Sequence, residues 1–246
     1  MTFTYWAILD GTDSALTLLA DCFNQPGCQV QFTEERNGTK NWTLRSSELV
    51  FEKPGDEWDT VKAWMTARVH AMNGAARLQD PWHHPVRIRE FRCRGAGGGP
   101  TEIHENWDWD PGPFPPRPPR TPEAQDLVRQ WAELALADKA VAKVLMVLTM
   151  PPTWTALGLV LDAIKHDLGG QKYLEHWMGK PGLRQFTGSI NFARNLAEGP
   201  RHMGKIDEKW NREAALPLWE AHGIVRELAR QWIGSKIDRV AEHKPR

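Results

Sequence analysis

The stretch Pro111-Gly-Pro-Phe-Pro-Pro-Arg-Pro-Pro-Arg-Thr-Pro122 decides how this chain of 246 residues is organised. Repeated proline fixes φ and removes backbone donors, so the segment must run extended. Its PxxP spacing could bind an SH3-like groove, but a semi-rigid spacer is the commoner use of such a segment. The sequence therefore predicts two domains, over residues 1–110 and 123–246, joined by a linker over 111–122.

Before the linker, the sequence has the pattern of an antiparallel sheet. Extended segments are predicted over 2–9, 29–33 and 42–51, and Asn37-Gly38 between the last two is typical of a type I′ hairpin turn. Two further strands are expected, at 85–93, where apolar and charged residues alternate, and at 101–109. One amphipathic helix over 57–72, ending at Asn73-Gly74, completes this predicted domain.

After the linker, the apolar spacing becomes helical. Thr121 is a predicted N-cap with Pro122 at the first helical position, and Asp138 is a predicted N-cap for the next helix. A third helix is expected between Pro151-Pro152 and Gly169-Gly170, with others over 172–178 and 183–196 and a last one around 219–233. The predicted fold class is α+β, an N-terminal antiparallel sheet with one helix followed by a C-terminal all-helical bundle.

Charge, cysteine content and apolar runs indicate in which compartment the protein works and which classes of partner it lacks. Thirty-one basic and 31 acidic residues cancel, so no global field draws the chain to nucleic acid or anionic lipid. Cys22, Cys28 and Cys93 are an odd number without CxxC spacing, which favours free thiols in a reducing compartment. The start lacks a signal-peptide pattern, and the longest apolar run, 140–150, is too short to span a bilayer. We expect a cytoplasmic protein without a membrane segment.

Polar groups gather between Phe186 and His202, around a predicted helix end and the loop after it. An arginine beside a histidine could hold a phosphate while the imidazole moves a proton, a combination that suits RNA cleavage. The alternative is structural, with polar side chains that bind helix-end carbonyls and an imidazole that packs on a tryptophan. The candidate catalytic residues are Arg194, Asn195, Arg201 and His202, with Asn191 as a candidate binding residue.

Two further groups of residues carry groups that could form a site. Arg87 and Arg89 on the predicted strand 85–93 are candidate binding residues and, with Arg92 and Arg94, form a candidate RNA-binding strand, although a row of strand arginines is more often a solvated face. His83, His84, Cys93 and His104 carry metal-binding groups in a spacing that matches no known ligand pattern, so no metal is expected. No cofactor is expected either, since no P-loop, GxGxxG, GxSxG or HExxH is present.

The C-terminal half resembles a poorly characterised group of bacterial proteins with a helical domain. The resemblance spans roughly 123–235 and rests on Ile164-Lys-His-Asp167-Leu-Gly-Gly170, Phe186-Thr187, Asn191 and Arg201-His202. It implies no particular chemistry. A weaker resemblance is to HEPN-type ribonucleases, including abortive-infection C-terminal domains, where an arginine and a histidine a few residues apart act on RNA at a helical dimer face. It implies Arg194 with Asn195 and His202, although seven residues, including Gly199-Pro200, separate this pair.

Three functional hypotheses follow. The first is a non-enzymatic module that recognises an unidentified protein partner, in a bacterial defence or stress pathway, with the 13 tryptophans packing cores and interfaces. The alternative is a HEPN-like, metal-independent ribonuclease, with His202 as acid or base, Arg194 or Arg201 on phosphate and Asn195 for orientation. The third is an RNA-binding protein. A homodimer is also expected, because helical domains of this size often bury an apolar face by two-fold pairing.

Overall fold

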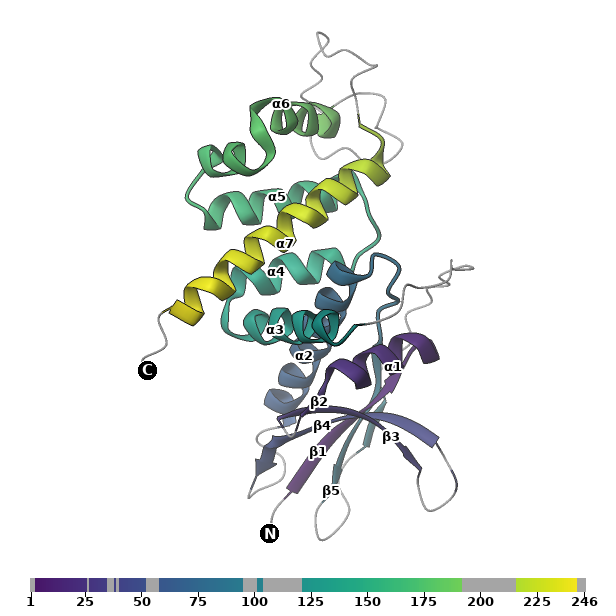
Figure 1. Cartoon of the computed structure of the whole chain (residues 1–246). Helices are drawn as coiled ribbons and strands as arrows, with labels where there is room; N and C mark the ends of the chain where they lie inside the picture. The colour runs from purple at the N-terminus through teal and green to yellow at the C-terminus, as the bar shows by residue number, and fades with distance from the viewer. Residues whose placement is uncertain are drawn as a thin grey trace. The chain divides into compact units, whose positions relative to one another are not determined.

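The computed structural model describes residues 3–25, 27–34, 38, 40–51, 58–94, 101–103, 121–191 and 216–242. They belong to two compact units, Met1–Leu136 and Ala137–Arg246, whose elements are labelled in Figure 1. Helix α3 (Pro122–Ala137) belongs almost entirely to the first unit, whereas the sequence assigns it to the helical domain. The predicted domain limits remain a prediction, because residues 104–120 lie outside the described part of the chain.

The first unit is built on a six-stranded antiparallel sheet with the strand order β2-β3-β4-β1-β5-β6, which confirms the predicted α+β class. Its strands are β1 (Phe3–Asp10), β2 (Asn24–Gln25), β3 (Cys28–Glu34), β4 (Lys40–Phe51), β5 (Arg87–Arg94) and β6 (Thr101–Ile103). The predicted hairpin is formed by β3 and β4, with Glu34 opposite Lys40 and Gly38 at φ +79° between them. The predicted turn type depends on Asn37, which lies outside the described residues.

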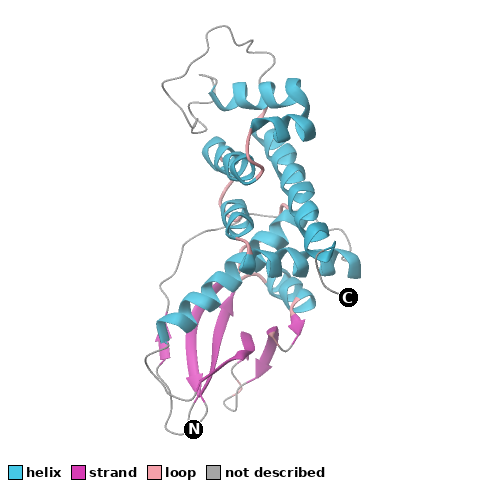
Figure 2. Ribbon diagram, turned by 90° about the vertical axis from the view of Figure 1, so that its left-hand side faces the viewer, coloured by secondary structure: helices cyan, strands magenta, loops and turns pink. Residues whose placement is uncertain are grey.

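Two helices, α1 (Asp13–Cys22) and α2 (Trp58–Gln79), pack on the sheet, and Figure 2 shows helices against one side of the magenta strands. The Trp58 ring lies 5.7 Å from the Tyr5 ring and 6.3 Å from the Phe91 ring, centroid to centroid. Tyr5 and Phe91 are buried on neighbouring strands, so this face of β1 and β5 is the apolar core of the unit. Helix α1 was not predicted from the sequence and adds to the one helix expected there.

The helix predicted over 57–72 was expected to end at Asn73-Gly74, and this predicted end was wrong. Helix α2 runs through Asn73 and Gly74 to Gln79, because Asn73 is buried inside the unit instead of capping a helix end. Its side chain binds the backbone of Val86, which follows the helix in sequence and lies just before β5. The apolar stretch after Gly74, including Ala75, Ala76 and Leu78, is then buried against the core.

The second unit holds α4 (Lys139–Leu148), α5 (Trp154–Asp167), α6 (Gln171–Asn191) and α7 (Leu218–Glu242). Asp138 caps α4 as predicted, with its carboxylate accepting from the Ala140 and Val141 amides. Helix α6 is two helical segments that meet at Gly179, where φ is +70° and ψ 151°, which agrees with the two helices predicted there. The unit's core includes the fully buried rings of Trp154, Phe186 and Trp232. In the ranges that the structure describes, no helix combines the length and apolarity needed to cross a bilayer.

Candidate functional site

The residues predicted to cleave RNA cannot be placed. Arg194, Asn195, Arg201 and His202 lie outside the described residues, and Asn191 is the last residue of α6. The ribonuclease constellation therefore stays a prediction. The other predicted binding residues, Arg87 and Arg89, both lie on β5 within the first unit.

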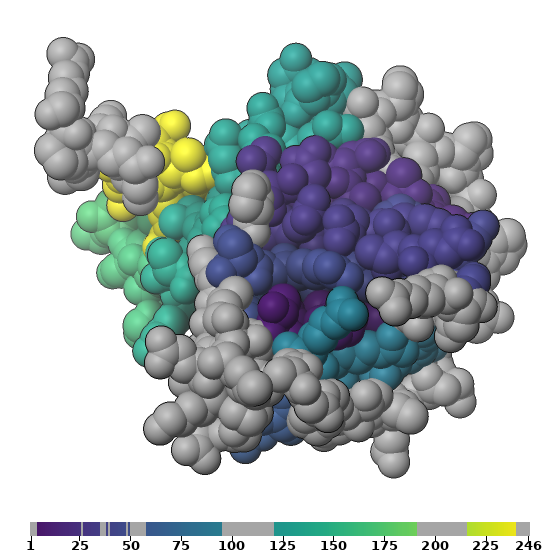
Figure 3. Space-filling view, turned by 90° about the horizontal axis from the view of Figure 1, so that it is seen from below, coloured from purple at the N-terminus to yellow at the C-terminus, as the bar shows by residue number. Residues whose placement is uncertain are grey.

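Arg87 and Arg89 belong to a polar surface of the sheet on the face opposite to the Tyr5–Phe91 core. Register defines this surface: Trp6 of β1 pairs with Arg92 of β5 on one side and with Arg45 of β4 on the other, and paired residues share a face. In Figure 3, β1 and β5 come to the surface side by side. We call its charged residues, together with Trp6 and Asn41, the arginine face: Trp6, Asp10, Asn41, Arg45, Arg87, Arg89, Glu90, Arg92 and Arg94. Ile8 and Thr43, which pair with each other between β1 and β4, lie on the same side of the sheet and are buried.

Two arginines of this face are neutralised by carboxylates. Arg87 donates from Nε at 2.8 Å and from Nη2 at 2.5 Å to Asp10 Oδ2 on the neighbouring strand. Arg92 forms a forked pair with Glu90, Nε to Oε1 at 2.8 Å and Nη2 to Oε2 at 3.0 Å. Asp10 and Glu90 each fix one arginine side chain along the sheet, so these four residues carry no net charge.

Arg89 is placed by a β-bulge. Ile8 pairs with Glu90 but the next residue, Leu9, pairs with Ile88, so Arg89 is the extra residue of β5. Its Nη2 reaches across the sheet to donate to Asn41 Oδ1 at 2.7 Å. Asn41 is buried and uncharged, so it orients the guanidinium without neutralising it.

Arg45 and Arg94 complete the positive charge of the face. The Arg45 guanidinium lies 5.5 Å from the Trp6 ring centroid, in cation–π range, and both arginines are exposed. Five arginines thus face two carboxylates, both already paired, and among the described residues Arg45, Arg89 and Arg94 have no carboxylate partner. The sequence predicted the β5 arginines but missed Arg45 and Trp6, because strand order brings β4 and β1 beside β5.

The residues considered for a metal are mostly buried within the first unit. His83 and His84 are buried, and His83 Nε2 lies 3.3 Å from Asn73 Oδ1. Burial raises the pKa of the Cys93 thiol, only partly countered by a hydrogen bond with Tyr5. His104 lies outside the described residues, and within the described ranges no three His, Cys, Asp or Glu side chains are grouped as metal ligands.

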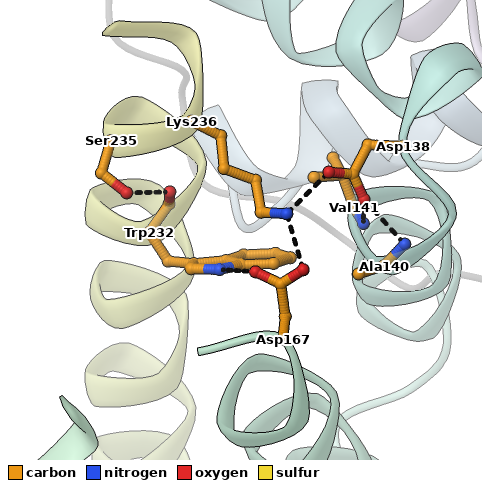
Figure 4. Close-up of polar contacts among 7 residues, drawn as sticks. All are labelled: Asp138, Ala140, Val141, Asp167, Trp232, Ser235 and Lys236. Carbon is orange, nitrogen blue, oxygen red and sulfur yellow. Dashed lines mark hydrogen bonds and ion pairs between the residues drawn. The ribbon is translucent and has the colours of Figure 1, made fainter. Parts of the chain in front are cut away.

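The second unit contains a charged cluster around Lys236 of α7, shown in Figure 4. Lys236 Nζ donates to Asp138 Oδ2 at 2.6 Å and to Asp167 Oδ1 at 2.7 Å, and Trp232 Nε1 donates to Asp167 Oδ2 at 2.9 Å. The cluster ties the start of α4 and the end of α5 to α7. All four carboxylate oxygens of Asp138 and Asp167 accept hydrogen bonds from the protein. The role of the cluster is therefore structural.

The pKa of Asp138 is lowered and the pKa of Lys236 is raised, as expected for an acid and a base that stabilise each other's charge. Burial raises the pKa of Asp138, but hydrogen bonds from Lys236, Val141 and Ala140 outweigh it and the net pKa is lowered. Burial lowers the pKa of Lys236, but hydrogen bonds and attraction from Asp138 and Asp167 outweigh it and the net pKa is raised. Both side chains are therefore held in their charged forms.

Comparison of the chain with protein-family models, curated proteins and solved structures finds no match. The resemblance to the bacterial group and to HEPN-type ribonucleases therefore stays a prediction. The arginine face, built from described residues alone, is the candidate site that the structure supports best.

Proposed function

We propose that the protein is a non-enzymatic recognition module of the cytoplasm that binds an acidic segment of a partner protein on its arginine face. The observation that carries this is the excess of charge: Arg45, Arg89 and Arg94 lack carboxylate partners among the described residues, on a chain whose overall charge is zero. A local cluster of one sign on a neutral chain attracts a partner of the opposite sign and sets its orientation. A role in a bacterial defence or stress pathway remains a prediction.

The arginine side chains of this face are suited to bind carboxylates. Arginine presents a planar fork that binds a carboxylate through two parallel hydrogen bonds, as the Arg92–Glu90 pair already does here. The side chain of Arg89 is held by Asn41 and that of Arg45 by Trp6, so less rotamer entropy is lost when they bind. An acidic peptide segment supplies several such groups at strand spacing.

An acidic protein fits this face better than RNA does. Sheet surfaces that read single-stranded RNA stack two or three bases on open aromatic rings. Trp6 is the one aromatic residue of the arginine face, and Arg45 already lies over its ring. The polar residues around it suit directional contacts with carboxylates, so RNA binding is kept as an outcome of the test.

Fluorescence anisotropy with two labelled probes tests the proposal. One probe is a peptide of alternating glutamate and leucine, and the other is single-stranded oligouridylate of equal net charge. We expect the peptide to bind more tightly and the double variant Arg45→Glu/Arg94→Glu to weaken that binding by about tenfold or more. Lys143→Glu/Lys172→Glu, which reverses two exposed lysines of the second unit, is the matched control and should leave binding unchanged.

The outcomes separate the hypotheses. Tighter binding of the oligouridylate, lost in the same double variant, would replace protein recognition by RNA recognition on this face. Equal loss in Lys143→Glu/Lys172→Glu would show that only overall charge matters and would overturn the assignment of the site.

A further inference from the structure

Among the residues that the structure describes, part of the outer edge of β3 has no neighbouring strand. β2 pairs only with Cys28 and Gln29, and beyond it the Val30 N–H donates to Phe23 O at 2.7 Å. Among the described residues, β3 has no ladder partner on that side from position 31 to 34. Peptide groups of a strand alternate in direction, so the N–H and C=O of Phe32 and Glu34 point outward as the N–H of Val30 does.

Residues 31–34 carry few of the features that usually protect a sheet edge. Natural edges carry charged side chains, lysine above all, or proline, a bulge or a covering element, and Glu34 is the one charged residue of this stretch. Gln31-Phe-Thr-Glu34 contains neither proline nor lysine, and its register with β4 is regular throughout. The Phe32 side chain is 51% exposed and is held against Trp42, 5.4 Å between ring centroids. The edge is therefore an exposed template for another extended strand.

We propose that this edge binds the same edge of a second copy of the chain, antiparallel, with the two Thr33 residues facing each other on a two-fold axis. In this register Phe32 of each copy lies opposite Glu34 of the other, and each such pair exchanges both N–H···O bonds. A register centred on Phe32 would instead require Val30, whose N–H already binds Phe23. Centring on Thr33 uses the outward groups of Phe32 and Glu34 alone.

The side chains of residues 32–34 are compatible with a second copy of the chain bound at this edge. The facing Thr33 residues form a non-hydrogen-bonded pair, in which side chains approach closely and threonine pairs are favourable. Glu34 lies opposite Phe32 of the second copy, so no two carboxylates meet. A two-fold arrangement covers both open edges at once and closes on itself, whereas an unrelated peptide would cover one edge only.

Sedimentation velocity of the full chain over a concentration series tests the pairing through a charge swap. Thr33→Lys and Thr33→Glu each place like charges across the axis, and each alone should raise the dimer dissociation constant by about tenfold or more. An equimolar mixture of the two should recover dimers, because opposite charges then meet. Thr33→Val controls for the hydrogen bond from Thr33 Oγ1 to Asn41 O, 3.2 Å, that all three variants lose.

A backbone variant tests the same edge independently. Glu34→Pro removes an outward N–H and should weaken association, whereas Glu34→Ala keeps that N–H and should not. A wild-type chain that is monomeric at every concentration overturns the proposal, and so does a mixture of Thr33→Lys and Thr33→Glu that fails to pair. The proposal does not rest on the proposed function, because Arg45→Glu/Arg94→Glu leaves the β3 edge intact.

Discussion

The side-chain amide of Asn73 binds both backbone groups of Val86: Asn73 Nδ2 donates to Val86 O at 2.6 Å, and Val86 N donates to Asn73 Oδ1 at 2.8 Å. The Asn73 side chain thus satisfies the backbone N–H and C=O of Val86, the residue just before β5. The two residues are buried, so no solvent competes for these groups. This contact joins α2 to the strand that carries most of the arginine face.

Replacing Asn73 by alanine should destabilise the first unit strongly. Asn73→Ala leaves the buried N–H and C=O of Val86 without these partners, at a cost of about 2–4 kcal/mol in the free energy of unfolding. Urea unfolding followed by circular dichroism measures this loss. Asn24→Ala, at an exposed asparagine of β2, is the matched control and should stay within about 0.5 kcal/mol of wild type. Equal stability of Asn73→Ala and the control would show that the Val86 contact contributes little.

Asn73 also shows where local sequence patterns stop being informative. Asn-Gly after an apolar run is a common helix end, so the sequence predicts a stop at Asn73-Gly74. The contact that overrides it joins Asn73 to Val86 across a loop, and no local pattern reports it. By contrast, α1 does have a local signal, since the Thr12 hydroxyl accepts from the Ala15 amide as an N-cap. The strands predicted over 2–9, 29–33, 42–51 and 85–93 and the pairing of β3 with β4, which depend on neighbouring residues alone, were confirmed. The strand predicted over 101–109 is described only as Thr101–Ile103.

The Lys236 cluster should contribute stability over a defined pH window. Lys236→Met leaves the half-buried carboxylates of Asp138 and Asp167 without their cation and should cost about 1–3 kcal/mol near pH 7. The folded pKa of Asp138 is lowered, so its contribution is present above about pH 4 and is lost as the pH falls through the folded value. The folded pKa of Lys236 is raised, so its contribution is present below about pH 10.4 and is lost as the pH rises through the folded value.

The measurement is the unfolding free energy of wild type and Lys236→Met across pH. We expect their difference to be level from about pH 5 to 9 and to shrink on both sides. Lys180→Met is the control, because Lys180 is 82% exposed and its nearest carboxylate, on Glu175, is 4.0 Å away. A difference that does not change with pH would mean that the lysine stem, and not its charge, stabilises the unit.

Two glycines of α6 should respond to alanine in opposite ways. Gly179 has φ +70° and ψ 151°, a conformation that is essentially closed to other residues, so Gly179→Ala should cost about 1–3 kcal/mol. Space is not the limit, because the nearest atom to an added Cβ is Pro181 Cδ at 3.8 Å. At Gly182, in a helical segment with nothing within 4 Å of an added Cβ, alanine should stabilise by about 0.5–1 kcal/mol.

Thermal unfolding of the two variants checks this contrast. If Gly179→Ala were as stable as Gly182→Ala, the break between the two segments of α6 would not depend on the conformation of Gly179. The helix predicted over 172–178 is confirmed, and the one predicted over 183–196 is confirmed as far as residue 191, where the described part of α6 ends.

The candidate site could be predicted only in part. Alternation along 85–93 places Arg87 and Arg89 on a strand, and this is local information. Their surroundings depend on strand order, which puts Arg45 of β4 and Trp6 of β1 next to β5, and on a bulge that directs Arg89 toward Asn41. Likewise Lys236 meets Asp138 across 98 positions of sequence, which no motif encodes. Long-range pairing, and not residue type, decides which charges are neutralised.

The last prediction concerns His202 and separates recognition from catalysis. If the protein acts by binding an acidic segment, no proton transfer is assigned to His202, and neither wild type nor His202→Ala should cleave labelled cellular RNA in the presence of a chelator. His176→Ala, at an exposed histidine of α6, is the matched control. Cleavage by wild type and by His176→Ala that is lost in His202→Ala would contradict the recognition proposal, because a metal-independent acid–base step would then run through that one imidazole.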